Sequence, residues 1–292
     1  MLTKLIITLV ALLVATAAGI FFAYFPPDSF TALNNASLFD NTTACWALVG
    51  VAAVGFVLGG ARGLLKKKAV LKPDVVVRHG VGSFISHWYT AFGIFMAIVS
   101  GIIMGIGLGL WTFRLWTIGP FAKTTGAVVS SLNLHYFAVV LTLFGSFFFV
   151  GDYLFSRNPS LLIPNLQDIT KGFIGKYFLR RPWTREDKYL SSQKSAAMPY
   201  FLIGLVVLVT GAVKVAAHIW PLKASFWGWA TVAHDIFAVF IVLYTIIHVA
   251  LVVFLGHWPA FWSWFTGTMK THEIEHEHKV WYEDLQTKTN KS

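Results

Sequence analysis

Apolar residues run along this chain in six long stretches, separated by polar connections. A helix needs about 20 mainly apolar residues to cross the hydrocarbon core of a bilayer, and each stretch reaches that length. The stretches are roughly Leu5–Phe25, Ala44–Leu64, Phe84–Leu108, Leu132–Phe155, Ala196–Ile219 and Phe226–Leu255. The pattern therefore predicts an all-α, polytopic membrane bundle of about six transmembrane helices.

The first stretch fits two interpretations. Lys4, the apolar run after it and the small residues Ala15, Thr16 and Ala17 resemble a secretory signal peptide. The run is long for a signal core, which favours a retained helix. Both interpretations leave the topology of the later helices unchanged.

Composition supports a membrane protein over a soluble domain. Only 12% of the 292 residues are charged, about half of what a soluble domain carries, and 56% are hydrophobic. Twelve tryptophans are typical of a protein with two membrane interfaces.

The net charge of +10 follows from topology. Nineteen of the 23 Lys and Arg residues lie before the first stretch, in the connections 62–79 and 156–195, or in the tail after residue 269. By the positive-inside rule these segments are cytoplasmic, and so are both termini, in a bacterial inner membrane. No nucleic-acid partner is indicated.

Cysteine usage limits the cofactors. Cys45 is the single cysteine, so the chain forms no internal disulfide and does not ligate an iron–sulfur cluster by itself. There is no C-x-x-C-H motif for covalent haem attachment.

Histidine is the residue type that stands out inside the stretches. Of ten histidines, His79, His218 and His257 lie at or beyond span ends, and three lie in the tail sequence HEIEHEH, where solvated side chains are expected more than a metal site. Four lie within the predicted spans: His87, His135, His234 and His248. Ionisable groups inside a membrane usually mark function.

The predicted topology sorts these four histidines into two pairs by depth. His135 and His234 lie toward the outside, and His87 and His248 toward the cytoplasm. The fourteen residues from His234 to His248 keep both on one helix face, about 21 Å apart along the axis. Two b-type haems, each held by two histidines, would satisfy this arrangement. The alternative is that the imidazoles bond to hydroxyls and carbonyls of neighbouring helices.

Further residues have more than one interpretation. Gly101, Gly105 and Gly109, and isolated Gly93, Gly145, Gly204 and Gly211, suit close helix packing or clearance for a porphyrin. Asp235 could orient an imidazole or cap the outer helix end. Three cations near the outer face are possible partners of haem propionates or plain interfacial charges: Arg114, Lys123 and Lys214.

Several segments together resemble the cytochrome b (gamma) subunit of membrane-bound formate dehydrogenases, a family related to the cytochrome b of nickel–iron hydrogenases. They cover about residues 80 to 285 and read SHWYTAFGIFMAIVSG (86–101), LHYFAVVLTLFG (134–145), KYLSSQK (188–194), LVTG (208–211), the 234/248 histidine pair and HEHKVWYEDL (276–285).

The resemblance implies a four-helix dihaem core over 80–269, an N-terminal two-helix extension over 1–79 and a cytoplasmic tail over 270–292. It implies that His135 and His234 ligate the outer haem and His87 and His248 the inner one, the pairing that depth also suggests. The implied partners are an iron–sulfur subunit, docked near residues 110–131, and a molybdenum or tungsten subunit that catalyses formate oxidation, which this chain does not.

A quinone, menaquinone or ubiquinone, is implied beside the inner haem, near Ser192, Gln193 and His248. The family's usual Lys-Tyr-Asn-Ala-Gly-Gln-Lys differs here at three positions, since Leu190, Ser191 and Ser192 replace Asn-Ala-Gly. Loss of the asparagine removes one hydrogen bond to a quinone oxygen and puts the preferred quinone in doubt.

Other functions stay open at this point. The partner enzyme could be a nickel–iron hydrogenase or another molybdoenzyme. Without haem, the intramembrane histidines and Asp152 would suit a proton-relay transporter. Such a transporter needs a continuous row of polar groups from one membrane face to the other. A haem-free structural anchor is the third alternative.

Overall fold

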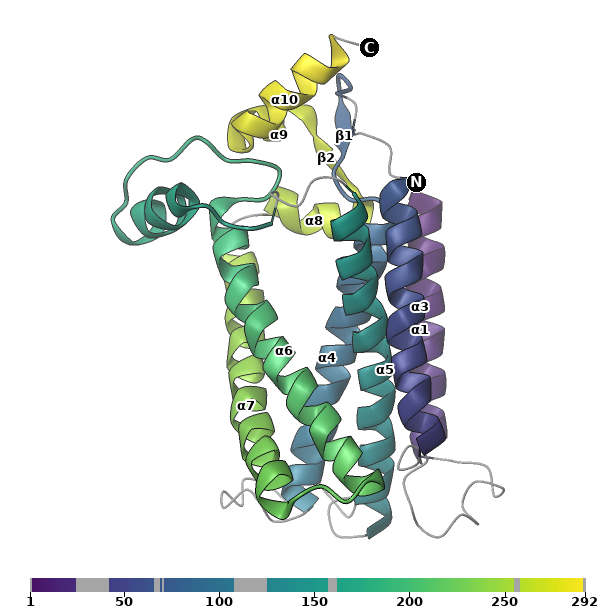
Figure 1. Ribbon diagram of the computed structural model, residues 1–292. Helices are drawn as coiled ribbons and strands as arrows, with labels where there is room; N and C mark the ends of the chain where they lie inside the picture. The colour runs from purple at the N-terminus through teal and green to yellow at the C-terminus, as the bar shows by residue number, and fades with distance from the viewer. Residues whose placement is uncertain are drawn as a thin grey trace.

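A computed structural model describes residues 2–24, 42–65, 69, 71–107, 125–156, 162–254 and 258–290. Six long helices run side by side (Figure 1). They are α1 (Leu2–Tyr24), α3 (Thr42–Leu64), α4 (Val81–Gly107), α5 (Thr125–Phe155), α6 (Ser191–Ile219) and α7 (Ala224–Phe254). In the described residues the last five are long and apolar enough to cross a membrane, and α1 has a shorter apolar stretch, Leu5–Ala18. The predicted helical membrane bundle is confirmed.

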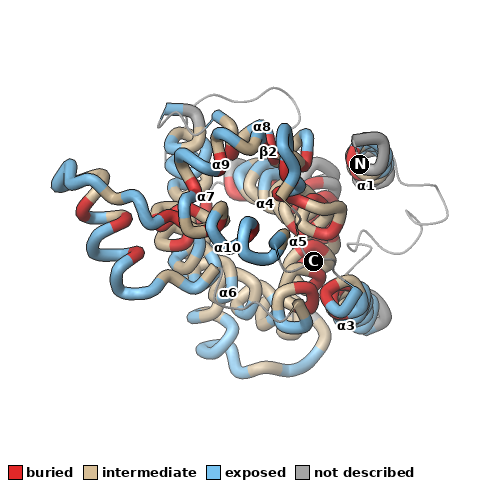
Figure 2. Tube along the Cα trace, turned by 90° about the horizontal axis from the view of Figure 1, so that it is seen from above, coloured by how far each residue is buried: buried red, intermediate tan, exposed pale blue. Residues whose placement is uncertain are grey.

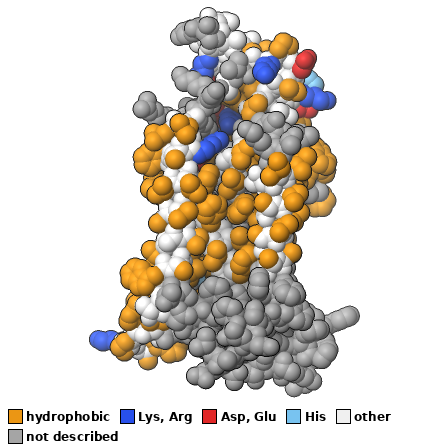
Figure 3. Space-filling view, turned by 90° about the vertical axis from the view of Figure 1, so that its right-hand side faces the viewer, with side chains coloured by type: hydrophobic (Ala, Val, Ile, Leu, Met, Phe, Trp, Pro, Cys, Tyr) orange, Lys and Arg blue, Asp and Glu red, His pale blue; other side chains and the backbone are white. Residues whose placement is uncertain are grey.

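The remaining elements gather at one end of the bundle, here termed the cap. They are β1 (Val75–Val77), the π-helix η3 (Asp168–Phe178), α8 (Trp258–Thr266), β2 (Thr268–Lys270), α9 (Thr271–Glu277) and α10 (Lys279–Thr289). Helix α1 begins at this same end (Figure 1). Figure 3 shows an apolar band along the helices, with most of the visible charged side chains near the cap.

The long helices form two groups. Helix α5 packs against α4, α3 and α1, whereas α6 packs mainly against α7. The share of the span that is buried within the protein is 44% in α5, 6% in α7 and zero in α6. Viewed from the cap end, buried residues accordingly concentrate on α5 and its neighbours and in the cap (Figure 2).

Glycines set the close approach of α3 to α5. Gly55, Gly59 and Gly63 are spaced four residues apart and lie on one face of α3. A Cβ on Gly59 would lie 2.0 Å from the Phe148 carbonyl oxygen, and a Cβ on Gly55 would lie 2.6 Å from that of Phe144. Small residues at this spacing let two membrane helices pack backbone to backbone.

Helix α1 is packed into the same group. Leu12 is fully buried in an apolar cluster with Met96, Leu134, Ala138 and Leu141 of α4 and α5. Helix α1 therefore lies against α4 and α5.

An ion pair joins α3 to α5 near the cap. Arg62 donates to Asp152 over 2.5 Å from its Nη1 to Oδ1. Asp152 was the candidate proton relay in the transporter alternative. Its pairing with an arginine gives it a structural role, because the arginine compensates the charge of a buried carboxylate.

The cap has its own small apolar core. β1 and β2 pair antiparallel, with Val76 opposite Met269. Both side chains are buried together with Ala260, Ile274, Trp281 and Leu285.

The cap corrects the expectation that its histidines are solvated. His272 and His276 are exposed, but His278 is fully buried, and its Nδ1 lies 2.6 Å from the Asp187 carbonyl oxygen. His79, predicted at a span end where an imidazole meets water, is 1% exposed. His278 is buried where the tail meets the segment before α6, and His79 is buried where Trp264 of α8 stacks on its ring.

The glycine packing predicts a position-specific stability effect. Gly59→Val should lower stability by about 1–3 kcal/mol or more, because its side chain would push α3 away from α5. Gly50→Val is the matched control in the same helix, since a Cβ on Gly50 meets nothing within 4 Å. Thermal unfolding of both variants in detergent checks this, and equal losses would show that the α3–α5 contact is not as tight as described.

Candidate functional site

The outer pair of histidines meets between the two helix groups. His135 on α5 and His234 on α7 have ring centroids 6.4 Å apart and ring planes at 68°. Two metal–imidazole bonds of about 2 Å each, plus about 1 Å from each nitrogen to its ring centroid, add up to about 6 Å. The observed centroid separation of 6.4 Å therefore matches that expected of two imidazoles bound to one metal ion.

Hydrogen bonds assign the tautomer of His234. Its Nδ1 lies 3.0 Å from the Val207 carbonyl oxygen and 3.2 Å from Thr210 Oγ1. A carbonyl oxygen only accepts, so Nδ1 carries the hydrogen. The Nε2 lone pair is therefore left to bind a metal, with α6 as the outer support that fixes the ring.

The same reasoning holds for His135. Its Nδ1 lies 3.0 Å from Ser100 Oγ. The Ser100 hydroxyl donates to the Met96 carbonyl oxygen over 2.7 Å, so it accepts from His135. Both imidazoles thus keep Nε2 as the ligating atom.

Two glycines flank these imidazoles. A Cβ on Gly211 would lie 3.1 Å from Cε1 of His234, which is tighter than ordinary contact. A Cβ on Gly101 would lie 3.8 Å from Cε1 of His135. A side chain at position 211 would therefore press on the His234 ring, and glycine leaves room for it.

The inner pair is held differently. His87 lies six residues after the start of α4, and His248 six residues before the end of α7, so both are near the cap. The His87 ring stacks on Trp264 of α8, with centroids 4.1 Å apart, and meets the edge of Trp88.

The proposed quinone residues Ser192 and Gln193 lie in the first turn of α6. The oxygen Oε1 of Gln193 accepts from the Leu190 backbone N–H over 3.2 Å and faces Arg78 at 3.4 Å. Ser192 Oγ accepts from the Tyr177 hydroxyl over 3.3 Å. These contacts orient both side chains. They do not use the N–H groups of the Gln193 amide, which can therefore donate to a ligand.

The substituted residues beside them have structural roles. Leu190 is 1% exposed and forms the N-terminal cap position of α6. The fully buried Ser191 hydroxyl lies 2.9 Å from both Asp168 Oδ1 and Glu186 Oε2. Lys194, also buried, lies 3.5 Å from Asp168 Oδ2. A buried polar network thus anchors η3 to the start of α6.

Burial also affects the titratable groups next to this turn. Arg78 is 2% exposed, and desolvation lowers the pKa of its guanidinium to about 10, partly offset by Tyr189 and Glu277. Arg78 stays charged at neutral pH. Desolvation raises the pKa of the Tyr189 hydroxyl, so this side chain stays a neutral donor.

The candidate propionate partners are only partly described. Arg114 and Lys123 lie outside the described residues, as do Gly109 and His257. Lys214 on α6 lies 3.6 Å from Asp235 on α7. Asp235 was expected to orient an imidazole or cap a helix end. Asp235 instead lies inside α7 and pairs with Lys214, while the Val207 carbonyl and Thr210 orient His234.

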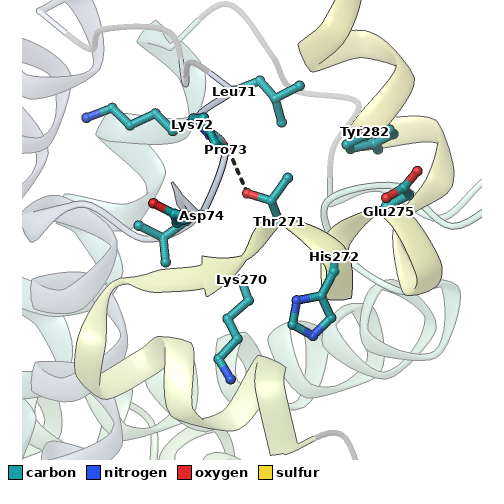
Figure 4. Close-up of a pocket in the computed structure, with 10 residues that line it drawn as sticks. Leu71, Lys72, Pro73, Asp74, Lys270, Thr271, His272, Glu275 and Tyr282 are labelled. Atoms are coloured by element: carbon teal, nitrogen blue, oxygen red, sulfur yellow. Dashed lines mark hydrogen bonds between the residues drawn. The ribbon is translucent and has the colours of Figure 1, made fainter.

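A groove in the cap lies apart from the histidine pairs. It is formed by β1, β2, α9 and α10, and Thr271 donates across it to the Lys72 carbonyl oxygen over 2.7 Å (Figure 4). Its lining is Leu71, Lys72, Pro73, Asp74, Val75, Lys270, Thr271, His272, Glu275 and Tyr282. Among the described residues, no three His, Cys, Asp or Glu side chains group closely enough to hold a metal ion by themselves.

Sequence reasoning missed the groups that orient the ligands. Ser100, Thr210 and the Val207 carbonyl are far from their histidines in the chain. The available signal was a small hydroxyl residue in an otherwise apolar span. Trp264 carried no such signal, because tryptophan is common at membrane interfaces.

Comparison with known families fits this geometry. A protein-family model described as prokaryotic cytochrome b561 matches residues 78–267, well over half of the chain. Searches of curated proteins and of solved structures found no match. The matched segment contains all four intramembrane histidines, and His135 and His234 have the separation and the tautomers that a haem iron requires. The chain therefore belongs to the prokaryotic cytochrome b561 family, the membrane electron-transfer cytochromes that carry b-type haem.

Proposed function

We propose that this chain is a dihaem membrane subunit that carries electrons between an iron–sulfur subunit on the outer face and quinone near the cap. The observation that carries the proposal is the outer pair, whose centroids are 6.4 Å apart while hydrogen bonds occupy both Nδ1 atoms. A b-type haem supplies one-electron redox chemistry when bound.

The inner site is proposed from position and neighbours. His87 lies six residues after the start of α4 and His248 six residues before the end of α7, so both lie near the cap. His248 also shares α7 with His234, fourteen residues away, so one helix supplies a ligand to each site. The rise of about 21 Å between them keeps the edges of two macrocycles within reach of electron tunnelling.

The quinone site is proposed at the first turn of α6. Arg78 and the Leu190 N–H fix the carbonyl end of Gln193, so its amide nitrogen has a defined direction in which to donate to a quinone oxygen. The cap side is the proposed cytoplasmic side, because the cationic connections gather there. Proton uptake from the cytoplasm then couples quinone reduction to the membrane potential.

This direction of transfer conserves energy without a pump. Each electron that moves inward against the membrane potential stores about 2.3 kcal/mol per 100 mV. Two electrons per quinone double that amount. The same residues serve the reverse direction, in which quinol drives substrate reduction.

We propose a formate dehydrogenase as the partner, with its iron–sulfur subunit at the outer face and a molybdenum or tungsten catalytic subunit beyond. Two segments of the resemblance, 188–194 and 276–285, pack together in the cap. Lys188 Nζ lies 5.9 Å above the Trp281 ring, and the Val280 N–H donates to the Glu186 carbonyl oxygen over 3.1 Å.

A nickel–iron hydrogenase is the second candidate, since the family match covers residues 78–267 and leaves the tail out. Co-purification of the native complex, with assays of formate and hydrogen oxidation, separates the two.

Haem content tests the proposal directly. The purified chain should contain two b haems, measured by a reduced-minus-oxidised spectrum and pyridine haemochrome quantitation. His248→Ala should contain one, because it removes a ligand of the inner site alone, and quinone reduction should stop while the outer haem stays reducible. A chain without haem, or a His248→Ala variant that keeps both haems, would contradict the assignment.

A second variant pair tests the outer site without touching a ligand. Gly211→Val should lose the outer haem, about half of the total, because its side chain would displace the His234 ring. Gly204→Val lies two turns away on α6, where a Cβ meets nothing within 4 Å, and should keep both haems. Equal haem content in the two variants would mean that the His234 ring does not bind haem in the position described.

A further inference from the structure

Three aromatic rings from two segments form a continuous stack at the inner end of α4. The Trp264 indole lies between His79, with centroids 3.7 Å apart and planes at 18°, and His87, with centroids 4.1 Å apart and planes at 23°. His79 is 1% exposed. The tryptophan therefore has an imidazole on each face, one of which belongs to a proposed haem ligand.

Backbone hydrogen bonds hold the stack together. Helix α8 ends at Gly267, which has a positive φ of 74°, a conformation that glycine adopts without strain. The Gly267 carbonyl oxygen accepts from the N–H groups of Arg78 and His79 over 3.0 and 3.1 Å. The end of α8 is thereby joined to the residues that lead into α4, which places Trp264 against His79.

A side-chain bond fixes Trp264 from the α4 side. The Trp88 Nε1–H donates to the Trp264 carbonyl oxygen over 3.1 Å, and the Trp88 ring meets His87 edge-on at 5.1 Å. His87 thus lies among aromatic groups on two sides.

The inner and outer ligands are oriented by different forces. His135 and His234 have hydrogen-bond acceptors at Nδ1, which raise the basicity of the ligating nitrogen. For His87 the described part of the chain provides stacking instead of such an acceptor. Aromatic stacking fixes a ring plane but adds no negative charge to it.

We propose that Trp264 is a positioning residue for His87. Its indole fixes the imidazole plane of this ligand, the role that a hydrogen bond at Nδ1 serves for His135 and His234. The inference rests on the proposed haem ligation by His87. Trp264 itself does not touch iron or quinone in this proposal.

The test compares substitutions at two tryptophans of α8. Trp264→Leu removes the stack, Trp264→Phe keeps a smaller ring, and Trp262→Leu is the control, since Trp262 is 55% exposed and contacts Phe261 and Phe265 rather than His87. The readout is the set of low-spin ferric haem signals in electron paramagnetic resonance. The signal that His87→Ala removes identifies the inner haem.

In Trp264→Leu we expect a changed inner-haem resonance signal, because the imidazole plane is free to turn. Trp264→Phe should give a smaller change in the same direction, while Trp262→Leu and the outer haem should not change.

The outcomes separate this inference from the function on which it rests. If His87→Ala loses no haem, the ligand assignment fails. If His87→Ala loses one haem and both Trp264 variants match the wild type, the assignment stands and the positioning role is wrong. Where Trp264→Leu does not assemble, Trp264→Phe decides, since an inner signal identical to the wild type overturns the proposal.

Discussion

An imidazole inside a bilayer needs a partner for each of its two nitrogens, and this requirement organises the bundle. In His135 and His234 a carbonyl or hydroxyl oxygen satisfies Nδ1, and a metal ion is the natural partner for the remaining lone pair. The two rings are 6.4 Å apart and come from different helix groups. A shared iron would therefore join α4 and α5 to α6 and α7 across an interface where the helices themselves contact little.

Separate contacts hold the helices together on each side of that interface. Glycines draw α3 and α4 against α5, with carbonyl contacts at Gly59 and a close approach at Gly93 and Thr142. Helices α6 and α7 have their own links, including the pair Tyr200 and Thr245, whose hydroxyls lie 3.3 Å apart. Most helix contacts lie within each group and few join the two groups, so a ligand bound at their junction would influence how the groups are placed.

Because of the cap, the two histidine pairs are surrounded by different kinds of side chain. Away from the cap, Ser100 and Thr210 orient His135 and His234, the proposed ligands of the outer haem. Near the inner site, a folded segment of strands and short helices supplies aromatic rings and a buried polar network around Ser191. The surroundings of the two proposed ligand pairs differ in hydrogen bonding, which is one of the levers by which a protein sets a haem potential.

The sequence alone determined the features that depend on local pattern. The apolar runs predicted the helices because the thickness of a bilayer sets their length. The fixed rise and turn of an α-helix predicted that His234 and His248 share a face, and alternation of direction predicted the depth-matched pairs. The sequence motifs also predicted a cytochrome b family, which the family match over residues 78–267 supports, while the relation to formate dehydrogenases stays a proposal.

Only the tertiary structure decided which groups meet from distant parts of the chain. Ser100 reaches His135, Val207 and Thr210 reach His234, and Trp264 reaches His87, over separations that no local pattern encodes. The tail was expected in water because it is polar, yet His278 is fully buried where it meets the segment before α6. Periodicity shows which side of a helix is apolar, but the contacts across helices follow from packing in three dimensions.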